Sequence, residues 1–143
     1  MITSDAETVP IPQLARKAEV DKKLPNKAVS RKKKGSNRRR KAVKRLGLHH
    51  QKIARQRKDF HYKTSKQLLD KYDVIGFEDL NVKGLARTRM AKSILDAGWS
   101  EFLSILVCKA ESAGKLAIAV NPNGTTQNCS NCGTRVPKEI QDR

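Results

Sequence analysis

The charged residues of this chain are concentrated in one stretch, which limits where a core can form. Between Lys22 and Lys66 there are 19 lysines and arginines and a single acid, Asp59, whereas residues 68–120 carry acids and bases in near balance. Lysine and arginine are almost never buried without a partner. We therefore predict a basic segment followed by a small globular part, in a chain of single-domain length, 143 residues.

The net charge of +17 indicates a polyanionic partner, most often a nucleic acid. The sequence has no run of 18 apolar residues, and its first residues, 1–5, lack the basic and apolar regions of a signal peptide. We therefore expect a cytoplasmic protein with no membrane partner and no small-molecule substrate. Its three cysteines are expected to bind a metal or to be buried rather than to form disulfides.

The basic segment is predicted to form a helical hairpin. A first helix over residues 13–24 is expected to end at Pro25, and residues 30–37 are expected to form a loop around Gly35. A second helix is predicted over residues 36–72, loosened at Gly47. A seam recurs along it at alternating steps of three and four residues, which favours packing against the shorter first helix. The residues of this seam are Val43, Leu46, His50, Ile53, Arg57, Phe60, Thr64 and Leu68.

The part that follows is predicted to have the order strand, helix, strand. Residues 73–77 and 116–120 are short apolar runs, and each is expected to form a buried strand. One helix is predicted over residues 91–113, ending at Gly114. Its apolar face consists of Trp99, Phe102, Leu103, Leu106, Ala110 and Ala113. This order predicts a βαβ unit with parallel strands, and hence an α/β fold, while prolines confine residues 8–12 to a sheet edge or a loop.

The basic run of residues 31–41 and the rest of the helix predicted over residues 36–72 are expected to bind nucleic acid. A run of this kind can also be a solvated arm, but its density favours contact with phosphates. Phe60 and Tyr62 are the only aromatic residues nearby, so we expect recognition of backbone and shape in structured nucleic acid rather than base stacking. His49, His50 and His61 are expected on the helix surface. The predicted nucleic-acid-binding residues are Arg31, Lys32, Lys33, Lys34, Arg38, Arg39, Arg40, Lys41, Lys44, Arg45, Lys52, Arg55 and Arg57.

Glu78 directly follows the first predicted strand. The carboxyl ends of strands are where α/β sheets bind ligands and metals. One interpretation is a Mg²⁺ ligand for phosphoryl transfer, although a two-metal site needs several converging carboxylates. The alternative, which spacing alone favours, is that Glu78 and Asp79 simply begin a solvated loop.

Near the end of the sequence, Cys129 and Cys132 form a C-x₂-C pair followed by Gly133. Turn-forming neighbours and Pro137 favour half of a zinc knuckle over a redox pair, because the first cysteine of a redox pair lies at a helix N-terminus. Gly133 is expected to take a positive φ as the loop closes. Structural zinc needs four ligands, and no Cys or His follows Cys132. Cys108 is expected to be an ordinary helix residue.

Three segments, in order, resemble the OrfB/TnpB-type proteins of insertion sequences, which are transposon-encoded, RuvC-like nucleases related to the small CRISPR effectors. The first comprises residues 30–36 and 52–60, the second residues 78–85, and the third residues 125–133. The second and third segments together are specific, and the likeness extends over nearly the whole chain.

The resemblance implies part of a ribonuclease-H-like (RuvC) sheet, with a basic helical-hairpin insertion and the first half of a zinc ribbon. It divides the chain into a residual N-terminal strand region (1–12), the basic helical hairpin (13–72), a βαβ core (73–122) and an incomplete zinc ribbon (123–143). Three acids in this family bind Mg²⁺ for DNA cleavage, and a Cys₄ site binds Zn²⁺. Glu78 matches the second acid, and Cys129 and Cys132 match half of the zinc site.

The family's first acid would precede Met1 and its third would follow Arg143, so we expect a piece of a transposition-associated nuclease, truncated at both ends. The resemblance implies DNA and a transposon-derived guide RNA as partners. We expect nucleic-acid binding to be retained and DNA cleavage to be lost. Two alternatives stay open: a stand-alone basic RNA-binding protein, and a nuclease completed by another chain.

Overall fold

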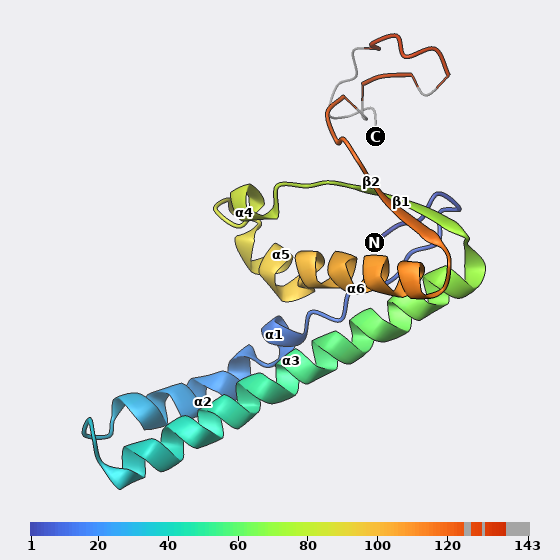
Figure 1. Ribbon diagram of the computed structural model, residues 1–143. Helices are drawn as coiled ribbons and strands as arrows, with labels where there is room; N and C mark the ends of the chain where they lie inside the picture. The colour runs from blue at the N-terminus through green and yellow to red at the C-terminus, as the bar shows by residue number, and fades with distance from the viewer. Residues whose placement is uncertain (125–126, 130, 137–143) are drawn as a thin grey trace.

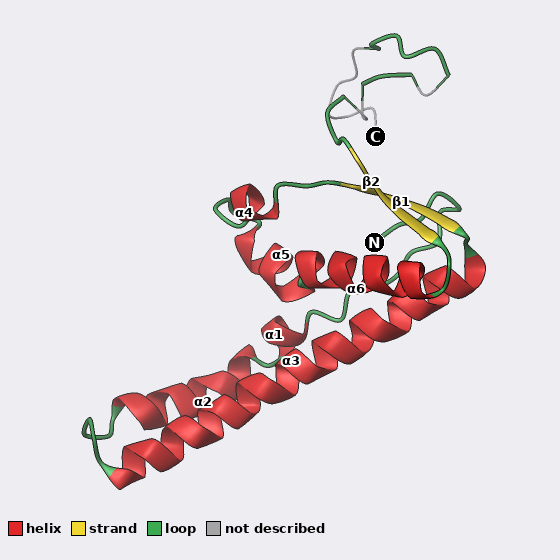
Figure 2. Ribbon diagram, viewed as in Figure 1, coloured by secondary structure: helices red, strands yellow, loops and turns green. Residues whose placement is uncertain are grey.

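The computed structural model describes residues 1–124, 127–129 and 131–136, and it consists of a long helical hairpin joined to a small α/β part (Figure 1). In chain order the elements are α1 (Leu14–Lys17), α2 (Glu19–Ser30), α3 (Asn37–Lys71), β1 (Val74–Glu78), α4 (Val82–Leu85), α5 (Ala91–Ala97), α6 (Trp99–Ser112) and β2 (Leu116–Val120). Figure 2 shows the sheet and α6 near one end of α3 and α2 beside its other end. No described helix is both long and apolar enough to span a bilayer.

The hairpin is built on α3, which has 35 residues and is therefore about 52 Å long. It begins after Ser36, whose hydroxyl accepts a hydrogen bond from the Arg39 N–H (3.2 Å), and it ends before Tyr72. The prediction of one helix over residues 36–72 is confirmed, and Gly47 causes no break. The predicted loop is confirmed as well, since residues 31–36 connect α2 to α3 and Gly35 has φ +83°.

The first helix differs from the prediction. α1 and α2 are separated at Ala18, and α2 continues through Pro25 to Ser30, so the prediction that Pro25 ends the helix is wrong. Proline removes one helical N–H donor. However, α2 packs along α3, and most helical stability in proteins comes from such packing. Beyond the end of α2, the Lys32 ammonium donates to the Ala28 carbonyl (3.1 Å).

The buried face of α3 agrees only in part with the predicted seam. Ile53 is buried as predicted, whereas Val43 and His50 are exposed. The reason is that α3 packs on α2 in its first half and on α6 in its second half, so its buried face turns around the helix. The buried residues of α3 are Ala42, Ile53, His61, Thr64, Ser65 and Leu69.

The sheet is parallel and two-stranded, with Val74 opposite Leu116 and Glu78 opposite Val120. The predicted strand–helix–strand order is confirmed, with α4, α5 and α6 in the crossover. α6 packs under the sheet and against α3. The buried core consists of Leu69, Phe102, Leu106 and Ala110, and the half-buried residues packed against it are Met1, Leu68, Ile75, Phe77, Trp99, Leu103 and Ala117.

The two strands are only half buried, which corrects the prediction of buried strands. Ile75 and Phe77 pack against the core, whereas Val74, Leu116 and Ile118 are 59, 58 and 47% exposed. Side chains alternate between the two faces of a strand. Because α6 covers one face of the sheet, the side chains of the other face remain exposed.

The predicted single helix over residues 91–113 is in fact two helices, because Gly98 has φ +62°. This left-handed conformation ends α5, and residues with a side chain rarely adopt it. A Cβ at Gly98 would lie 2.8 Å from Arg57 Cδ and 3.0 Å from His61 Cε1. The break therefore lets the α5–α6 junction approach α3 closely. Ala113, predicted on the apolar face, is exposed.

Residues 1–9 form a small hairpin that rests on the end of α3. Ile2 and Thr8 make an antiparallel bridge. Lys71 Nζ lies 2.6 Å from Glu7 Oε1, and the Tyr72 hydroxyl donates to the Asp5 carboxylate. The hydrogen bond that the Lys71 ammonium donates to the Glu7 carboxylate raises the pKa of Lys71 above its usual value. These contacts fix the N-terminal hairpin beside β1, which begins two residues after Tyr72.

Candidate nucleic-acid interface and metal-ligating residues

One side of α3 carries a row of exposed positive charges. Four predicted contacts share the side turned away from buried Ile53: Lys41, Lys44, Lys52 and Arg55. We call these four residues the α3 basic stripe. At about 1.5 Å per residue, the stripe is about 21 Å long. Within the described part of the chain none of the four forms an ion pair, so their charge is available to a polyanion.

The start of α3 extends this surface. Gly35, Ser36, Arg39, Arg40 and Lys44 line a hollow of about 370 Å³ together with Val43. The N–H groups of a first helical turn and the positive end of the helix dipole favour an anion at such a place. The exposed predicted bases in the loop and at the start of the helix are Arg31, Lys33, Lys34, Arg38, Arg40 and Arg45.

Three of the predicted contacts are half-buried: Lys32, Arg39 and Arg57. Lys32 is engaged by the carbonyl at the end of α2. Arg57 is turned toward α5, where its Nη2 lies 3.6 Å from Asp96 Oδ1. The guanidinium of Arg57 is therefore used inside the protein and lies apart from the α3 basic stripe.

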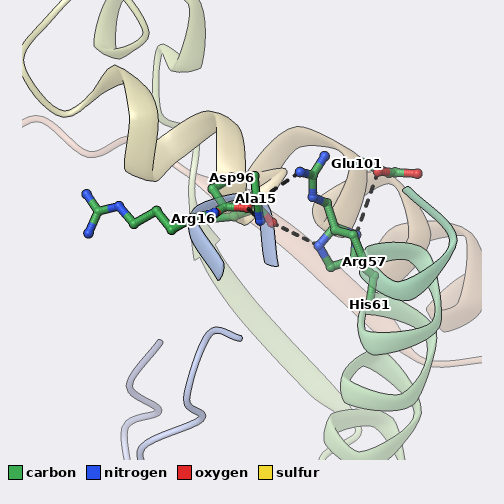
Figure 3. Close-up of polar contacts among 7 residues, drawn as sticks. Ala15, Arg16, Arg57, His61, Asp96 and Glu101 are labelled. Carbon is green, nitrogen blue, oxygen red and sulfur yellow. Dashed lines mark hydrogen bonds and ion pairs between the residues drawn. The ribbon is translucent and has the colours of Figure 1, made fainter. Parts of the chain in front are cut away.

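A buried polar cluster joins α1, α3 and α5, and the sequence pattern did not indicate it (Figure 3). The side chain of Asp96 is only 4% exposed. Its carboxylate accepts the N–H groups of Ala15 (2.7 Å) and Arg16 (3.2 Å) and faces Arg57. No periodicity relates Asp96 to residues about eighty positions earlier, so this contact was not predictable from local spacing.

His61 belongs to the same region, and the prediction that it lies on the helix surface is wrong. It is 1% exposed, because α6 packs over this part of α3. Its Nε2 donates to the Ala97 carbonyl (2.9 Å), and its Nδ1 lies 3.9 Å from Glu101 Oε2. Its ring meets that of Phe102 edge-on. His61 therefore closes the α5–α6 junction rather than contacting solvent, whereas His50 is exposed as predicted.

Glu78 is the last residue of β1 and is exposed. The following residue, Asp79, donates its N–H to the Val120 carbonyl (2.9 Å), so pairing with β2 extends past the end of the strand. The geometry confirms that this carboxylate stands at the carboxyl end of a parallel strand. Among the described residues, no group of three or more His, Cys, Asp or Glu lies close enough to share a metal ion.

The cysteine pair lies in a small turn. Asn128 and Arg135 form an antiparallel bridge, the Cys129 N–H donates to the Thr134 carbonyl, and the Gly133 N–H donates to the Cys129 carbonyl (both 2.9 Å). Gly133 has φ +71°, as predicted. Residues 125–126, 130 and 137–143 of the predicted incomplete zinc ribbon lie outside the described residues.

Cys132 is the more exposed of the two thiols, and its Sγ lies 3.3 Å from the Thr134 hydroxyl. This hydroxyl lowers the pKa of Cys132, because it stabilises the thiolate. The thiolate is the form that binds metals. Cys108 lies in helix α6, as predicted, and its side chain is exposed. The donor set therefore fits two of the four positions of a structural zinc site and leaves two to be supplied.

Two family models match the chain. The OrfB_IS605 model, described as "Probable transposase", matches residues 1–89, and the model described as "Cas12f1-like, TNB domain" matches residues 99–143. The first match contains the N-terminal hairpin, the helical hairpin and β1 with Glu78. The second contains α6, β2 and the cysteine pair.

Relatives support the same family. A "Putative RNA-guided DNA endonuclease" of Streptomyces pristinaespiralis is 32% identical over 119 residues, covering 80% of this chain and 30% of that protein. "Putative RNA-guided DNA endonuclease InsQ" of Escherichia coli (strain K12) is 31% identical over 121 residues, covering 73% of this chain and 30% of that protein. "TnpB-like protein L79" of Acanthamoeba polyphaga mimivirus is 30% identical over 105 residues, covering 68% of this chain and 20% of that protein. The chain thus spans less than a third of the length of these relatives. It belongs to the OrfB family of insertion sequences and is a TnpB-type, transposase-associated protein.

Proposed function

We propose that this chain is the nucleic-acid-binding part of a TnpB-type, RNA-guided DNA endonuclease, with DNA and a structured guide RNA as its partners. The observation that carries the proposal is the α3 basic stripe, whose side chains are exposed and unpaired within the described residues over about 21 Å. The relatives named as RNA-guided DNA endonucleases support the same class of partner.

We propose that the chain recognises nucleic acid by contacts with the phosphate backbone. Lysine and arginine neutralise phosphates without reading sequence. The aromatic residues near the stripe offer little stacking surface, because Phe60 is half-buried and the ring of Tyr62 is already faced by two ammonium groups. Lys58 and Lys109 lie 5.9 and 5.3 Å from the centroid of that ring. Shape and charge, rather than base stacking, are therefore the proposed basis of binding.

Glu78 is proposed as one metal-binding carboxylate of a ribonuclease-H-like nuclease. Its place at the carboxyl end of a parallel strand suits a Mg²⁺ ligand. A two-metal phosphoryl-transfer site needs several carboxylates on converging strands, and the described residues offer Glu78 and its neighbour Asp79 at this point. We therefore propose that the chain binds nucleic acid but does not cleave DNA by itself.

Cys129 and Cys132 are proposed as two ligands of a zinc ribbon. Their turn, the positive φ of Gly133 and the lowered pKa of Cys132 agree with a thiolate pair prepared for a metal. Bound zinc would hold together the strands of such a ribbon. Two thiolates do not complete a tetrahedral site, so zinc is expected to bind at less than one ion per chain or between two chains.

The test is the salt dependence of binding to a duplex DNA of about 30 base pairs and to a hairpin RNA. In the variant Lys44→Gln/Lys52→Gln/Arg55→Gln, the slope of log K against log[salt] on duplex DNA becomes shallower by about 2.7, because each phosphate contact contributes about 0.9. An unchanged slope would contradict the proposed interface.

The matched control removes the same charge from the exposed loop around α4, in the variant Lys83→Gln/Arg87→Gln/Arg89→Gln. This variant is expected to leave the slope nearly unchanged. A plasmid-nicking assay with Mg²⁺ tests the second half of the proposal. Nicking by the purified chain that stops in Glu78→Gln would show that cleavage is retained after all.

A further inference from the structure

A second group of positive charges gathers around the ring of Tyr62, where α3 meets α6. Lys58 Nζ, one turn earlier on α3, lies 5.9 Å from the ring centroid, and Lys109 Nζ of α6 lies 5.3 Å from it. The face of an aromatic ring attracts ammonium groups. Lys109 Nζ also donates to the Tyr62 carbonyl (3.4 Å). We call Lys58, Tyr62 and Lys109 the Tyr62 cluster.

Within the described part of the chain, no acid forms an ion pair with this cluster. The acid next to Lys58 in sequence, Asp59, is paired with Lys63 (2.7 Å). An ammonium group has three N–H donors, and Lys109 uses one of them on the Tyr62 carbonyl. Two like charges held near one ring repel each other. Phosphates that accept hydrogen bonds from both ammonium groups would relieve this repulsion.

The Tyr62 cluster faces the same way as the α3 basic stripe. Tyr62 follows Lys44 by about five helical turns and Arg55 by about two, so its side chain leaves α3 on the same side. Lys66, one turn beyond Tyr62, is exposed as well. From Lys41 to Lys66 the basic surface is therefore about 38 Å long, compared with about 21 Å for the stripe alone.

We propose that the Tyr62 cluster binds phosphates of the same duplex that lies along the α3 basic stripe, so that the nucleic-acid interface crosses from the helical hairpin onto α6. This inference rests on the proposed function. A duplex advances about 3.4 Å per base pair, so the stripe alone spans about 6 base pairs and the longer surface about 11. A straight surface of this length suits a stiff duplex. A single strand is bound by stacking on aromatic rings, and the Tyr62 ring is already faced by two ammonium groups.

The probes are two DNA hairpins, with stems of about 6 and about 12 base pairs, and binding is followed by fluorescence anisotropy over a series of salt concentrations. In the variant Lys58→Gln/Lys109→Gln, the slope of log K against log[salt] on the longer stem is expected to become shallower by about 1.8, because each phosphate contact contributes about 0.9. On the shorter stem, which the stripe alone can span, we expect a nearly unchanged slope.

The matched control is Lys63→Gln/Lys92→Gln. It removes the same charge from two exposed lysines that are already paired, Lys63 with Asp59 and Lys92 with Glu19. We expect this variant to leave the slope nearly unchanged on both stems. Because the two double variants have equal net charge, a difference between them reports the place of the lysines and not the overall attraction of the chain for DNA.

A second measurement uses the wild-type chain and needs no substitution. Lysines are acetylated by an activated ester in the presence of each hairpin, and the rate at each site is read by mass spectrometry. The longer stem is expected to slow acetylation of Lys58 and Lys109 severalfold relative to Lys92, because a phosphate contact shields the ammonium group. The shorter stem is expected to shield these two lysines less.

Two results would overturn the inference and leave the proposed function intact. The first is an equal slope for Lys58→Gln/Lys109→Gln and its control on the longer stem, while the stripe variant Lys44→Gln/Lys52→Gln/Arg55→Gln still has a shallower slope. The second is equal acetylation of Lys58, Lys109 and Lys92 in the bound chain. Unchanged slopes in both the cluster variant and the stripe variant would overturn the two proposals together.

Discussion

The buried carboxylate of Asp96 is predicted to hold the helices α1, α3 and α5 together. It accepts two N–H groups at the start of α1 and faces the guanidinium of Arg57 in α3, while it belongs to α5. The substitution Asp96→Ala leaves the N–H groups of Ala15 and Arg16 and the guanidinium of Arg57 without their acceptor. We therefore expect this single change to loosen three helices at once.

The magnitude follows from those contacts. Hydrogen bonds to a charged group contribute about 1.5–3 kcal/mol each, and loss of a helix N-terminal acceptor costs about 0.5–2 kcal/mol. The pair with Arg57 adds less, because that side chain is 22% exposed and water screens it. We expect Asp96→Ala to lower the free energy of unfolding by about 3 kcal/mol. Asp96→Asn is expected to cost about half as much, since its amide oxygen still accepts one N–H.

Urea denaturation followed by circular dichroism is the measurement. With a slope of about 2 kcal/mol per molar urea, the midpoint of Asp96→Ala falls by about 1.5 M. The control is Asp70→Ala, which removes an exposed carboxylate from α3 and is expected to change stability by no more than about 0.5 kcal/mol. Equal midpoints for the two variants would refute the role assigned to Asp96.

Three other substitutions, two of them paired with a comparison variant, test the helix ends and the cysteine turn. Ser36→Ala removes the hydroxyl that accepts the Arg39 N–H and is expected to cost about 1 kcal/mol in urea denaturation. Gly98→Ala is expected to lower the free energy of unfolding by about 2–3 kcal/mol, and Gly35→Ala by about 1 kcal/mol. Both glycines have positive φ, but only a Cβ at Gly98 would meet neighbouring side chains. Equal losses for the two variants would argue against a close approach of Gly98 to α3. Zinc binding is measured in competition with a chromophoric chelator. Cys132→Ser is expected to abolish zinc binding, and Cys108→Ser is expected to leave it unchanged. One tightly bound zinc ion per wild-type chain would contradict the proposal that Cys129 and Cys132 form only half of a site.

The elements that local signals determine were predictable. The limits of α3 follow from the cap residue Ser36 and from the apolar run that starts after Tyr72. The parallel pairing of β1 and β2 follows from two short apolar runs separated by a helix. Gly35 was placed correctly in a loop and Gly133 in a turn with positive φ, because each stands among turn-forming residues. In all these cases the deciding interactions are close in sequence or belong to one repeating unit.

Features that depend on distant contacts were missed. His61 has the sequence environment of a surface residue, yet α6 buries it. Gly98 lies within an unbroken helical pattern, and only the approach of Arg57 and His61 explains why a glycine stands at that position. Pro25 is tolerated in α2 because the helix packs along α3. Sequence periodicity contains no information on which helix covers which, so these errors share one cause.

Helix α3 connects the proposed nucleic-acid interface to strand β1, whose last residue is Glu78. The α3 basic stripe lies along the outer side of α3, and the second half of the same helix packs on α6, which in turn supports β1. Only Tyr72 and Asp73 separate the end of α3 from the start of the strand that ends at Glu78. The contacts of Arg57 and His61 with the α5–α6 junction further fix the helix on the sheet. A phosphate backbone bound along the stripe would therefore have a set orientation relative to Glu78, because α3 packs on α6 and because Ile75 and Phe77 of β1 pack on the core that these two helices form.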